Sequence, residues 1–128
     1  MDDDLDDLDA LVGEWLPLPD VADRLGLDVG KVRRLLQDGH LVAVRRGERN
    51  VLSVPADLLV EAGQDGGPSV PLPELRGTLS VLGDSGYDAR AAVRWLFTAD
   101  PSLPGTPVEA LRAGRKTEVR RRAQALAF

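Results

Sequence analysis

Two glycines, Gly26 and Gly39, bound two short segments that each have the apolar spacing of an amphipathic helix. In the first segment Val21 and Leu25 lie one helical turn apart, directly before the first glycine. Glycine adopts the left-handed backbone conformation that commonly ends a helix, because it has no Cβ atom to clash. We therefore expect a short helix over residues 18–25 that ends at this glycine.

The second segment starts after Asp28, whose side chain can accept a hydrogen bond at the N-terminus of a helix. The apolar face of this segment consists of Val29, Val32, Leu35 and Leu36. The polar side carries Gly30, Lys31, Arg33, Arg34 and Gln37. Two short helices joined by the turn at residues 26–28 predict a helix-turn-helix.

A β-hairpin is expected directly after the two helices. Residues 41–45 and 51–54 favour strands, and the glycine and asparagine of the segment 47–50 suit a tight turn between them. Pro55 stops the second strand, and residues 56–61 are expected to form a short helix that returns to the core. The hairpin carries Arg45, Arg46 and Arg49.

The rest of the chain is predicted to be helical. Apolar spacing favours one helix from Leu75 to residues 83–86, another over residues 88–98, and a last one from about residue 107 to Phe128. The fold class we expect is mainly α with a small β-hairpin wing, that is, a winged helix-turn-helix followed by a helical C-terminal domain. The expected domains are an acidic flexible arm (1–14), the winged helix-turn-helix (15–61), a linker (62–70) and the helical domain (71–128). For the arm, a short helix that forms only when docked is the alternative.

The net charge of −5 hides a strong segregation of charge along the chain. Residues 1–20 contain eight acids and no base, whereas residues 21–50 contain seven bases and four acids. A second basic segment, residues 106–128, contains six bases and two acids. Because the distribution of charge decides whether a protein can approach DNA, an acidic total does not exclude a nucleic-acid partner.

Several classes of function are disfavoured by the composition. The chain has no cysteine and a single histidine, His40, so we expect no metal site, no cofactor and no enzymatic activity. The acidic N-terminus is unlike a signal peptide, and no apolar run approaches the roughly 18 residues of a membrane span. We expect a cytoplasmic, nucleoid-associated protein with no membrane partner.

The first part of the chain resembles the winged helix-turn-helix of excisionases and MerR-like regulators. The resemblance runs without a gap from Leu25 to Leu41 and continues through Val44–Gly47, Val54, Pro55 and residues 57–59. This resemblance implies that the second helix enters the major groove of double-stranded DNA and that the wing lies on the phosphates or in the minor groove. The residues it puts forward as DNA-binding are Lys31, Arg33, Arg34, Gln37, Arg45, Arg46 and Arg49. The alternative to DNA binding is that these side chains only form the solvent-exposed faces of the helix and the hairpin.

Nearly the whole chain is similar to a narrower family of small winged-helix DNA-binding proteins from high-GC Gram-positive bacteria, some of them Ser/Thr-kinase substrates. The residues that support this are 39–46, Gly86 with Tyr87, 95–103 and 119–125. The family's phosphorylated arm is not carried over, because residues 1–20 contain no serine or threonine. As a hypothesis, the aspartates of the arm compete with DNA for the basic face, so that deleting residues 2–9 should tighten DNA binding.

The C-terminal half leaves two functions open. Its helices could form a homodimer that matches palindromic DNA half-sites. Alternatively, Trp95, Leu96, Leu103 and residues 106–107, 111, 114 and 119 resemble the toxin-binding domain of some antitoxins, which implies a protein partner. The successive arginines Arg120, Arg121 and Arg122 point in different directions on a helix, so a single recognition surface is not expected from them.

Overall fold

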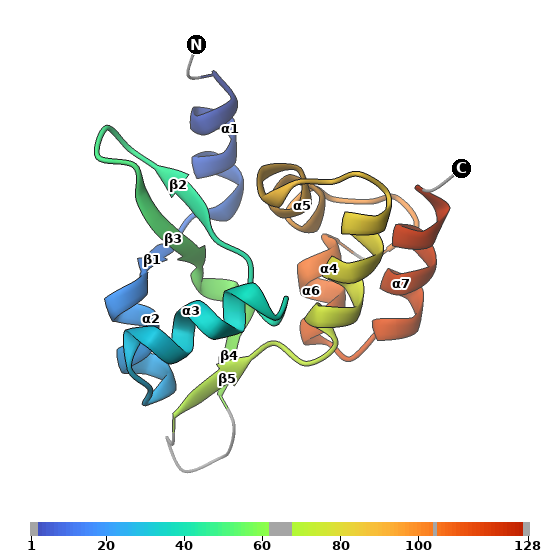
Figure 1. Cartoon of the computed structure of the whole chain (residues 1–128). Helices are drawn as coiled ribbons and strands as arrows, with labels where there is room; N and C mark the ends of the chain where they lie inside the picture. Colours follow the sequence, from blue (N-terminus) through green and yellow to red (C-terminus); the bar gives the residue numbers. More distant parts are fainter. Residues whose placement is uncertain (1–2, 62–67, 104, 127–128) are drawn as a thin grey trace.

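The computed structural model describes residues 3–61, 68–103 and 105–126, with the side chains of the first helix from Leu8 onward. The elements, in chain order, are α1 (Asp3–Val12), β1 (Trp15–Pro17), α2 (Leu18–Leu25), α3 (Val29–Gln37), β2 (Val44–Arg46), β3 (Val51–Pro55), a 3-10 turn (Ala56–Leu58), β4 (Leu59–Glu61), β5 (Ser69–Pro71), α4 (Leu75–Asp84), α5 (Ala89–Leu96), α6 (Pro107–Arg112) and α7 (Lys116–Ala125). The β1–β3 strands and α2–α3 lie on one side of the molecule and α4–α7 on the other (Figure 1). The predicted fold class, mainly α with a small wing, is confirmed.

Helices α2 and α3 form the predicted helix-turn-helix. Gly26 adopts a left-handed conformation with φ of 69°, and its backbone N–H donates to the last turn of α2. The Asp28 side chain accepts a hydrogen bond of 2.8 Å from the backbone N–H of Lys31, which caps α3. These local signals explain why the expected range of the first helix and the expected start of the second agree with the structure.

A short antiparallel sheet carries the wing. Its order is β1-β3-β2, with Leu16 opposite Val54 and Val44 opposite Ser53. The hairpin turn between β2 and β3 uses positive φ at Gly47. Strand β2 is shorter than the sequence predicts, and β1 was not predicted. Strands β1 and β2 have three residues each, and both are stabilised by pairing with β3 and not by their own sequence.

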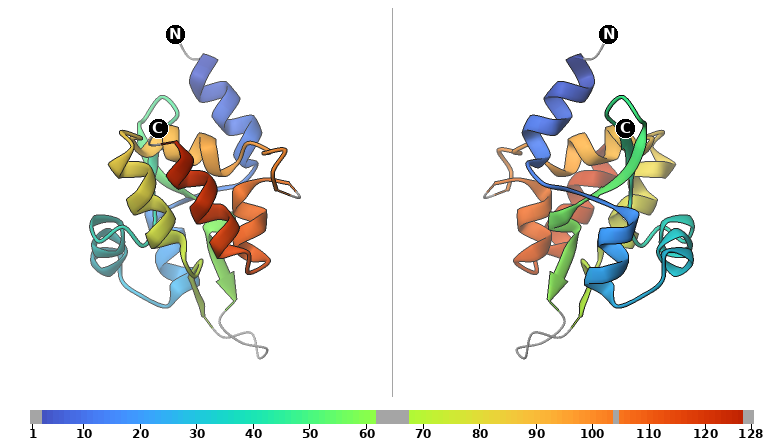
Figure 2. Two further views of the ribbon diagram at one scale, coloured as in Figure 1. Left: turned by 90° about the vertical axis from the view of Figure 1, so that its right-hand side faces the viewer. Right: turned by 90° about the vertical axis from the view of Figure 1, so that its left-hand side faces the viewer.

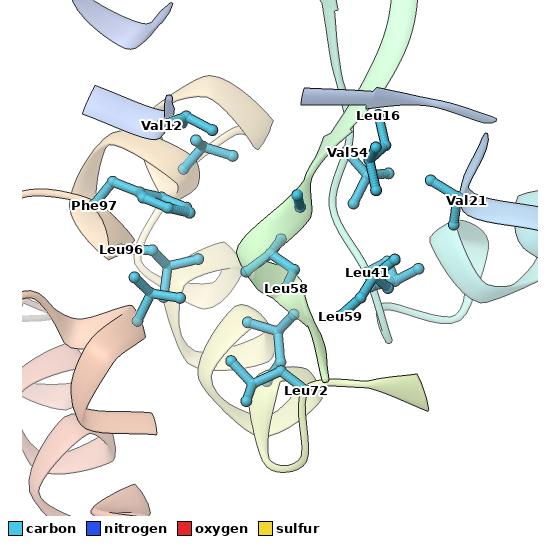
Figure 3. Close-up of a cluster of buried hydrophobic side chains, with 14 of the residues drawn as sticks. Val12, Leu16, Val21, Leu41, Val54, Leu58, Leu59, Leu72, Leu96 and Phe97 are labelled. Carbon is cyan, nitrogen blue, oxygen red and sulfur yellow. The ribbon is translucent and has the colours of Figure 1, made fainter. Parts of the chain in front are cut away.

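Most of the expected acidic arm, residues 3–12, is helix α1 in the structure, the helix that the sequence left as the alternative. Leu8 is 1% exposed and Val12 is 7% exposed, and Val12 lies next to Phe97 in the core (Figure 3). Leu8 and Val12 are one turn apart, so both reach the same apolar surface. Burial of this stripe outweighs the repulsion expected among the aspartates.

The helix expected over residues 56–61 is only a 3-10 turn, after which the chain becomes β4. This strand pairs with β5, with Val60 opposite Val70. Residues 62–67 of the expected linker lie outside the described residues, and its last two residues belong to β5. Leucine favours a helix at least as much as a strand, so the pairing with β5, which the local sequence does not show, decides the conformation here.

The single last helix that the sequence predicts is two helices, α6 and α7. A capping box fixes the start of α6, because Thr106 and Glu109 each hydrogen-bond the other's backbone N–H. Gly114, with φ of 85°, turns the chain between the two helices. The apolar periodicity runs through this glycine, which is why the pattern alone does not separate them.

The two halves share one apolar core (Figure 3). Leu58, at the end of the 3-10 turn, lies between the sheet and Leu72 and Leu96 of the C-terminal half, whereas Leu59 lies beside Leu41. Arg112 of α6 also donates hydrogen bonds to the backbone carbonyls of Asp57 (2.8 Å) and Leu59 (3.1 Å). The recognition elements and the C-terminal helices therefore hold fixed positions relative to each other.

None of the helices in the part of the chain that the structure describes is long and apolar enough to cross a membrane.

Candidate nucleic-acid interface

Helix α3 presents a row of polar side chains to solvent. Val32 is fully buried and anchors the helix, and the opposite side carries the predicted contact residues. These exposed residues are Lys31, Arg33, Arg34 and Gln37. In both views of Figure 2, α3 lies at the edge of the molecule opposite α6. Its polar side is therefore accessible to a large partner.

The wing and α3 meet at a hollow of about 260 Å³. Arg33 comes to it from α3 and Arg45 comes from β2, while Val29, Val51 and Leu52 form part of its apolar lining. Arg45 Nη1 also donates a hydrogen bond of 3.2 Å to the backbone carbonyl of Asn50, across the wing. The fold thus joins the two predicted contact elements into one surface.

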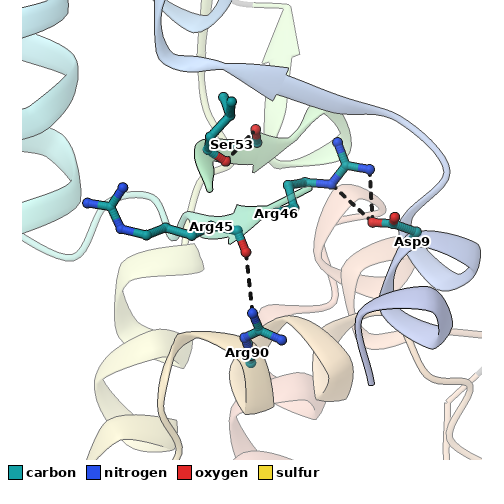
Figure 4. Close-up of polar contacts among 6 residues, drawn as sticks. Asp9, Arg45, Arg46, Ser53 and Arg90 are labelled. Atoms are coloured by element: carbon teal, nitrogen blue, oxygen red, sulfur yellow. Dashed lines mark hydrogen bonds and ion pairs between the residues drawn. The ribbon is translucent and has the colours of Figure 1, made fainter. Parts of the chain in front are cut away.

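Arg46 faces the other way (Figure 4). Its Nη2 lies 2.9 Å from Asp9 Oδ1, its Nε donates to the same oxygen at 3.0 Å, and its Cζ lies 4.9 Å from the Trp15 ring centroid. Successive side chains of a strand point to opposite faces, so Arg45 and Arg46 cannot both face α3. The structure therefore separates the Arg46 side chain from the other predicted contact residues, because it contacts Asp9 of α1 instead.

Among the described residues, the cations of α3 and the wing lack acidic partners, with the exception of Arg46, which pairs with Asp9. Within the described residues no carboxylate forms an ion pair with Lys31, Arg33, Arg34, Arg45 or Arg49. Uncompensated positive charges on one surface create a potential that attracts a polyanion. Phosphates would supply the missing counter-charge.

Two further arginines touch the same elements and were not among the predicted residues. Arg90 of α5 donates from Nη2 to the backbone carbonyl of Arg45 at 3.3 Å, and Arg76 of α4 donates from Nε to the backbone carbonyl of Asp38 at 3.1 Å. These contacts join residues 45 and 38 positions apart in the chain. No local pattern in the sequence reports such distant contacts.

The arginines of α7 are mostly paired. Arg120 and Lys116 both contact Glu74 at 3.4 Å, and Arg122 Nε lies 3.2 Å from Asp100 Oδ2. Arg121 is exposed. The different partners of Arg120 and Arg122 agree with the expectation that the three successive arginines do not form one surface.

Two short helices joined by a glycine turn and followed by a β-hairpin define a winged helix-turn-helix protein. The chain matches two family models, "DNA-binding protein Rv2175c, wHTH domain" over residues 2–59 and "Rv2175c C-terminal domain of unknown function" over residues 72–127. It therefore belongs to the Rv2175c family. The resemblance to a family of small bacterial winged-helix proteins is confirmed.

A sequence comparison and a structure comparison with Rv2175c show how far this likeness extends. DNA-binding protein Rv2175c of Mycobacterium tuberculosis (strain ATCC 25618 / H37Rv) is 42% identical over an alignment of 123 residues, and the match covers 87% of this chain and 79% of the relative. The NMR structure of Rv2175c superposes with a TM-score of 0.74 at 38% identity and covers 90% of this chain and 82% of the other. The likeness thus includes both halves of the fold.

Proposed function

We propose that this protein binds double-stranded DNA, with α3 in the major groove and the wing along the phosphates, and that it regulates transcription from chromosomal DNA in the cytoplasm. The observation that supports this most is the group of exposed cations without acidic partners among the described residues, two of which, Arg33 of α3 and Arg45 of the wing, line one hollow. The other members are Lys31, Arg34 and Arg49. The major groove of B-DNA is about 12 Å wide and admits a helix. The name of the relative, DNA-binding protein Rv2175c, supports the same conclusion.

The contacts divide into base reading and phosphate binding. Val29 and Gly30, at the start of α3, offer no hydrogen-bonding side chain, so base reading falls to residues further along the helix. Arg33 or Arg34 can donate two hydrogen bonds to guanine, and Gln37 can pair with adenine. Arg45 and Arg49 on the wing suit phosphates, which fix position without reading sequence. Affinity dominated by phosphates is the expected result.

Fluorescence anisotropy with random and genomic duplexes tests this division. We expect Arg33→Ala/Arg34→Ala to reduce the preference among duplexes, and Arg45→Ala/Arg49→Ala to weaken binding to all duplexes alike. Arg121→Ala, which removes an exposed arginine of α7, is the matched control and should bind like the wild type. Absence of wild-type binding even at about 50 mM salt, where phosphate contacts are strongest, would refute the proposal.

The C-terminal helices are the element through which we propose homodimerisation. A dimer would place two copies of α3 on half-sites about 34–36 Å apart, as other helix-turn-helix dimers require. Sedimentation of the protein with and without a palindromic duplex measures this directly. A folded protein that binds no DNA would instead direct attention to a toxin or another protein partner of the C-terminal half.

A further inference from the structure

The C-terminal half contacts the DNA-facing surface at two separate points. Arg90, in the first turn of α5, donates to the Arg45 carbonyl of the wing. Arg76, in the first turn of α4, donates to the Asp38 carbonyl at the end of α3. The two elements that form the proposed DNA site are therefore each hydrogen-bonded to a different arginine of the C-terminal half.

Each of these hydrogen bonds occupies only part of the guanidinium group. A guanidinium carries five N–H donors, and in each contact one nitrogen bonds to a backbone carbonyl. Both residues are exposed, and neither forms an ion pair with a carboxylate of the described residues. Most of their donors and their full positive charge thus remain free for an anion.

The elements that carry the two arginines reach the edge of the molecule on which α3 lies when the view of Figure 1 is turned by 90°. In both views of Figure 2, α4, the turn before α5 and the wing lie on the same side of the molecule as α3. Arg76 lines a hollow of about 590 Å³ between the end of α3 and α4, together with Gln37, Asp38 and Ser80. Figure 4 shows Arg90 directly beside the wing strand. A duplex seated on α3 would therefore bring its backbone near both positions.

We infer that the C-terminal half is part of the DNA-binding surface, with Arg76 and Arg90 contacting the phosphates that flank the groove occupied by α3. This inference rests on the proposed function and extends it to a domain whose family model is described as being of unknown function. Arginine suits this role because its planar fork binds phosphate oxygens in pairs while another N–H holds the protein backbone. The two halves act as one binding unit on DNA.

The salt dependence of DNA affinity in the full chain tests the inference. Each phosphate contact contributes about one unit to the slope of log K against log salt, so Arg76→Ala and Arg90→Ala should each reduce the slope by about one. Arg76→Lys and Arg90→Lys keep the charge and should retain most of the slope. Arg121→Ala, on α7, should leave the slope unchanged.

The outcomes separate the inference from the function on which it rests. If the wild type binds and Arg33→Ala/Arg34→Ala weakens binding, but the slope is unchanged in the Arg76→Ala/Arg90→Ala variant, the two arginines only position α3 and the wing, and the inference is wrong. If the alanine variants weaken binding with no change of slope, the same conclusion holds. If the wild type does not bind DNA, the proposed function fails, and the inference fails with it.

Discussion

The molecule has two basic regions that look alike in sequence and differ in structure. On α3 and the wing, Arg33 and Arg45 border an open hollow and have no acidic partner among the described residues. On α7, Arg120 and Arg122 pair with Glu74 and Asp100 of preceding segments. The same residue type thus leaves its charge available in one region and holds elements together in the other. The partner of an arginine indicates its role better than the number of arginines nearby.

The largest expected effect comes from reversing charge in the unpaired region. Arg33→Glu/Arg45→Glu should weaken DNA binding about a hundredfold or more, because each contact is worth about 1–3 kcal/mol and repulsion is added. The free energy of unfolding should change little, since both side chains are exposed. Anisotropy titration measures the affinity, and urea denaturation measures the stability.

The control variant is Arg115→Glu/Arg121→Glu, which changes the net charge by the same amount on the α7 side. It should weaken DNA binding far less, by about threefold or less, because exposed charges more than about 10 Å from the DNA are screened at 0.1 M salt. An equal loss of affinity in the two variants would mean that total charge decides DNA binding. The proposed difference between the α3–wing region and the α7 region would then be wrong.

Removing a paired arginine should have the opposite profile. Arg122→Ala should lower the free energy of unfolding by about 0.5–1 kcal/mol, as expected for a partly exposed ion pair, and leave DNA affinity unchanged. The backbone N–H of Ser102 and the Arg122 guanidinium both lower the pKa of the Asp100 carboxyl below its ordinary value of 3.8, against the opposing effect of burial. Denaturation at several pH values is the measurement.

The pH dependence follows from the direction of that shift. A carboxyl whose pKa is lowered by folding stabilises the folded state above its ordinary pKa, and this contribution is lost as pH falls through the folded pKa. The difference between wild type and Arg122→Ala should therefore be full at neutral pH and should shrink as pH falls below about 3.8. A difference that is independent of pH would contradict the assigned ion pair.

A smaller effect is expected from Glu74→Gln, which removes the shared partner of Lys116 and Arg120 while keeping the shape of the side chain. All three groups are more than one-third exposed, so the cost in unfolding free energy should be about 0.5 kcal/mol. If the variant instead bound DNA more tightly, by tenfold or more, the paired region would belong to the DNA surface after all. Thermal denaturation and anisotropy together measure both quantities.

The smallest effect concerns the pair between α1 and the wing. Asp9→Asn removes the carboxylate that holds Arg46, and because Arg46 faces away from α3 we expect DNA affinity to rise by about threefold or less. Deleting residues 2–9 is a poorer test of the acidic segment, because it also removes buried Leu8, and such a loss costs about 2–5 kcal/mol. A tenfold gain with Asp9→Asn would support strong competition between the acidic segment and DNA.

What the sequence predicts well is local. The boundary between α2 and α3 depends on Gly26 and Asp28, whose conformation and hydrogen bond act within a few residues. The recognition helix therefore begins where the pattern places it, and the hairpin turn falls within residues 47–50 as predicted, although strand β2 covers only Val44–Arg46. Four of the predicted contact residues lie on one exposed side of α3 for the same reason.

What the sequence does not predict depends on distant contacts. Strand β1 exists because it pairs with β3, and α1 is ordered by apolar contacts that include Leu8 and Val12. The different roles of Arg45 and Arg46 were available from strand alternation, which puts neighbours on opposite faces. The identity of their partners, Asn50 for one and Asp9 for the other, required the structure.

The central claim is that DNA lies on α3 and the wing and not on α7. An NMR titration of the isotope-labelled full chain with a short duplex tests it most directly, because backbone amide shifts report the contacted face residue by residue. We predict the largest shifts in residues 29–37 and 44–51, with residues 116–125 unchanged. Shifts concentrated in residues 116–125, with α3 and the wing unaffected, would contradict the account.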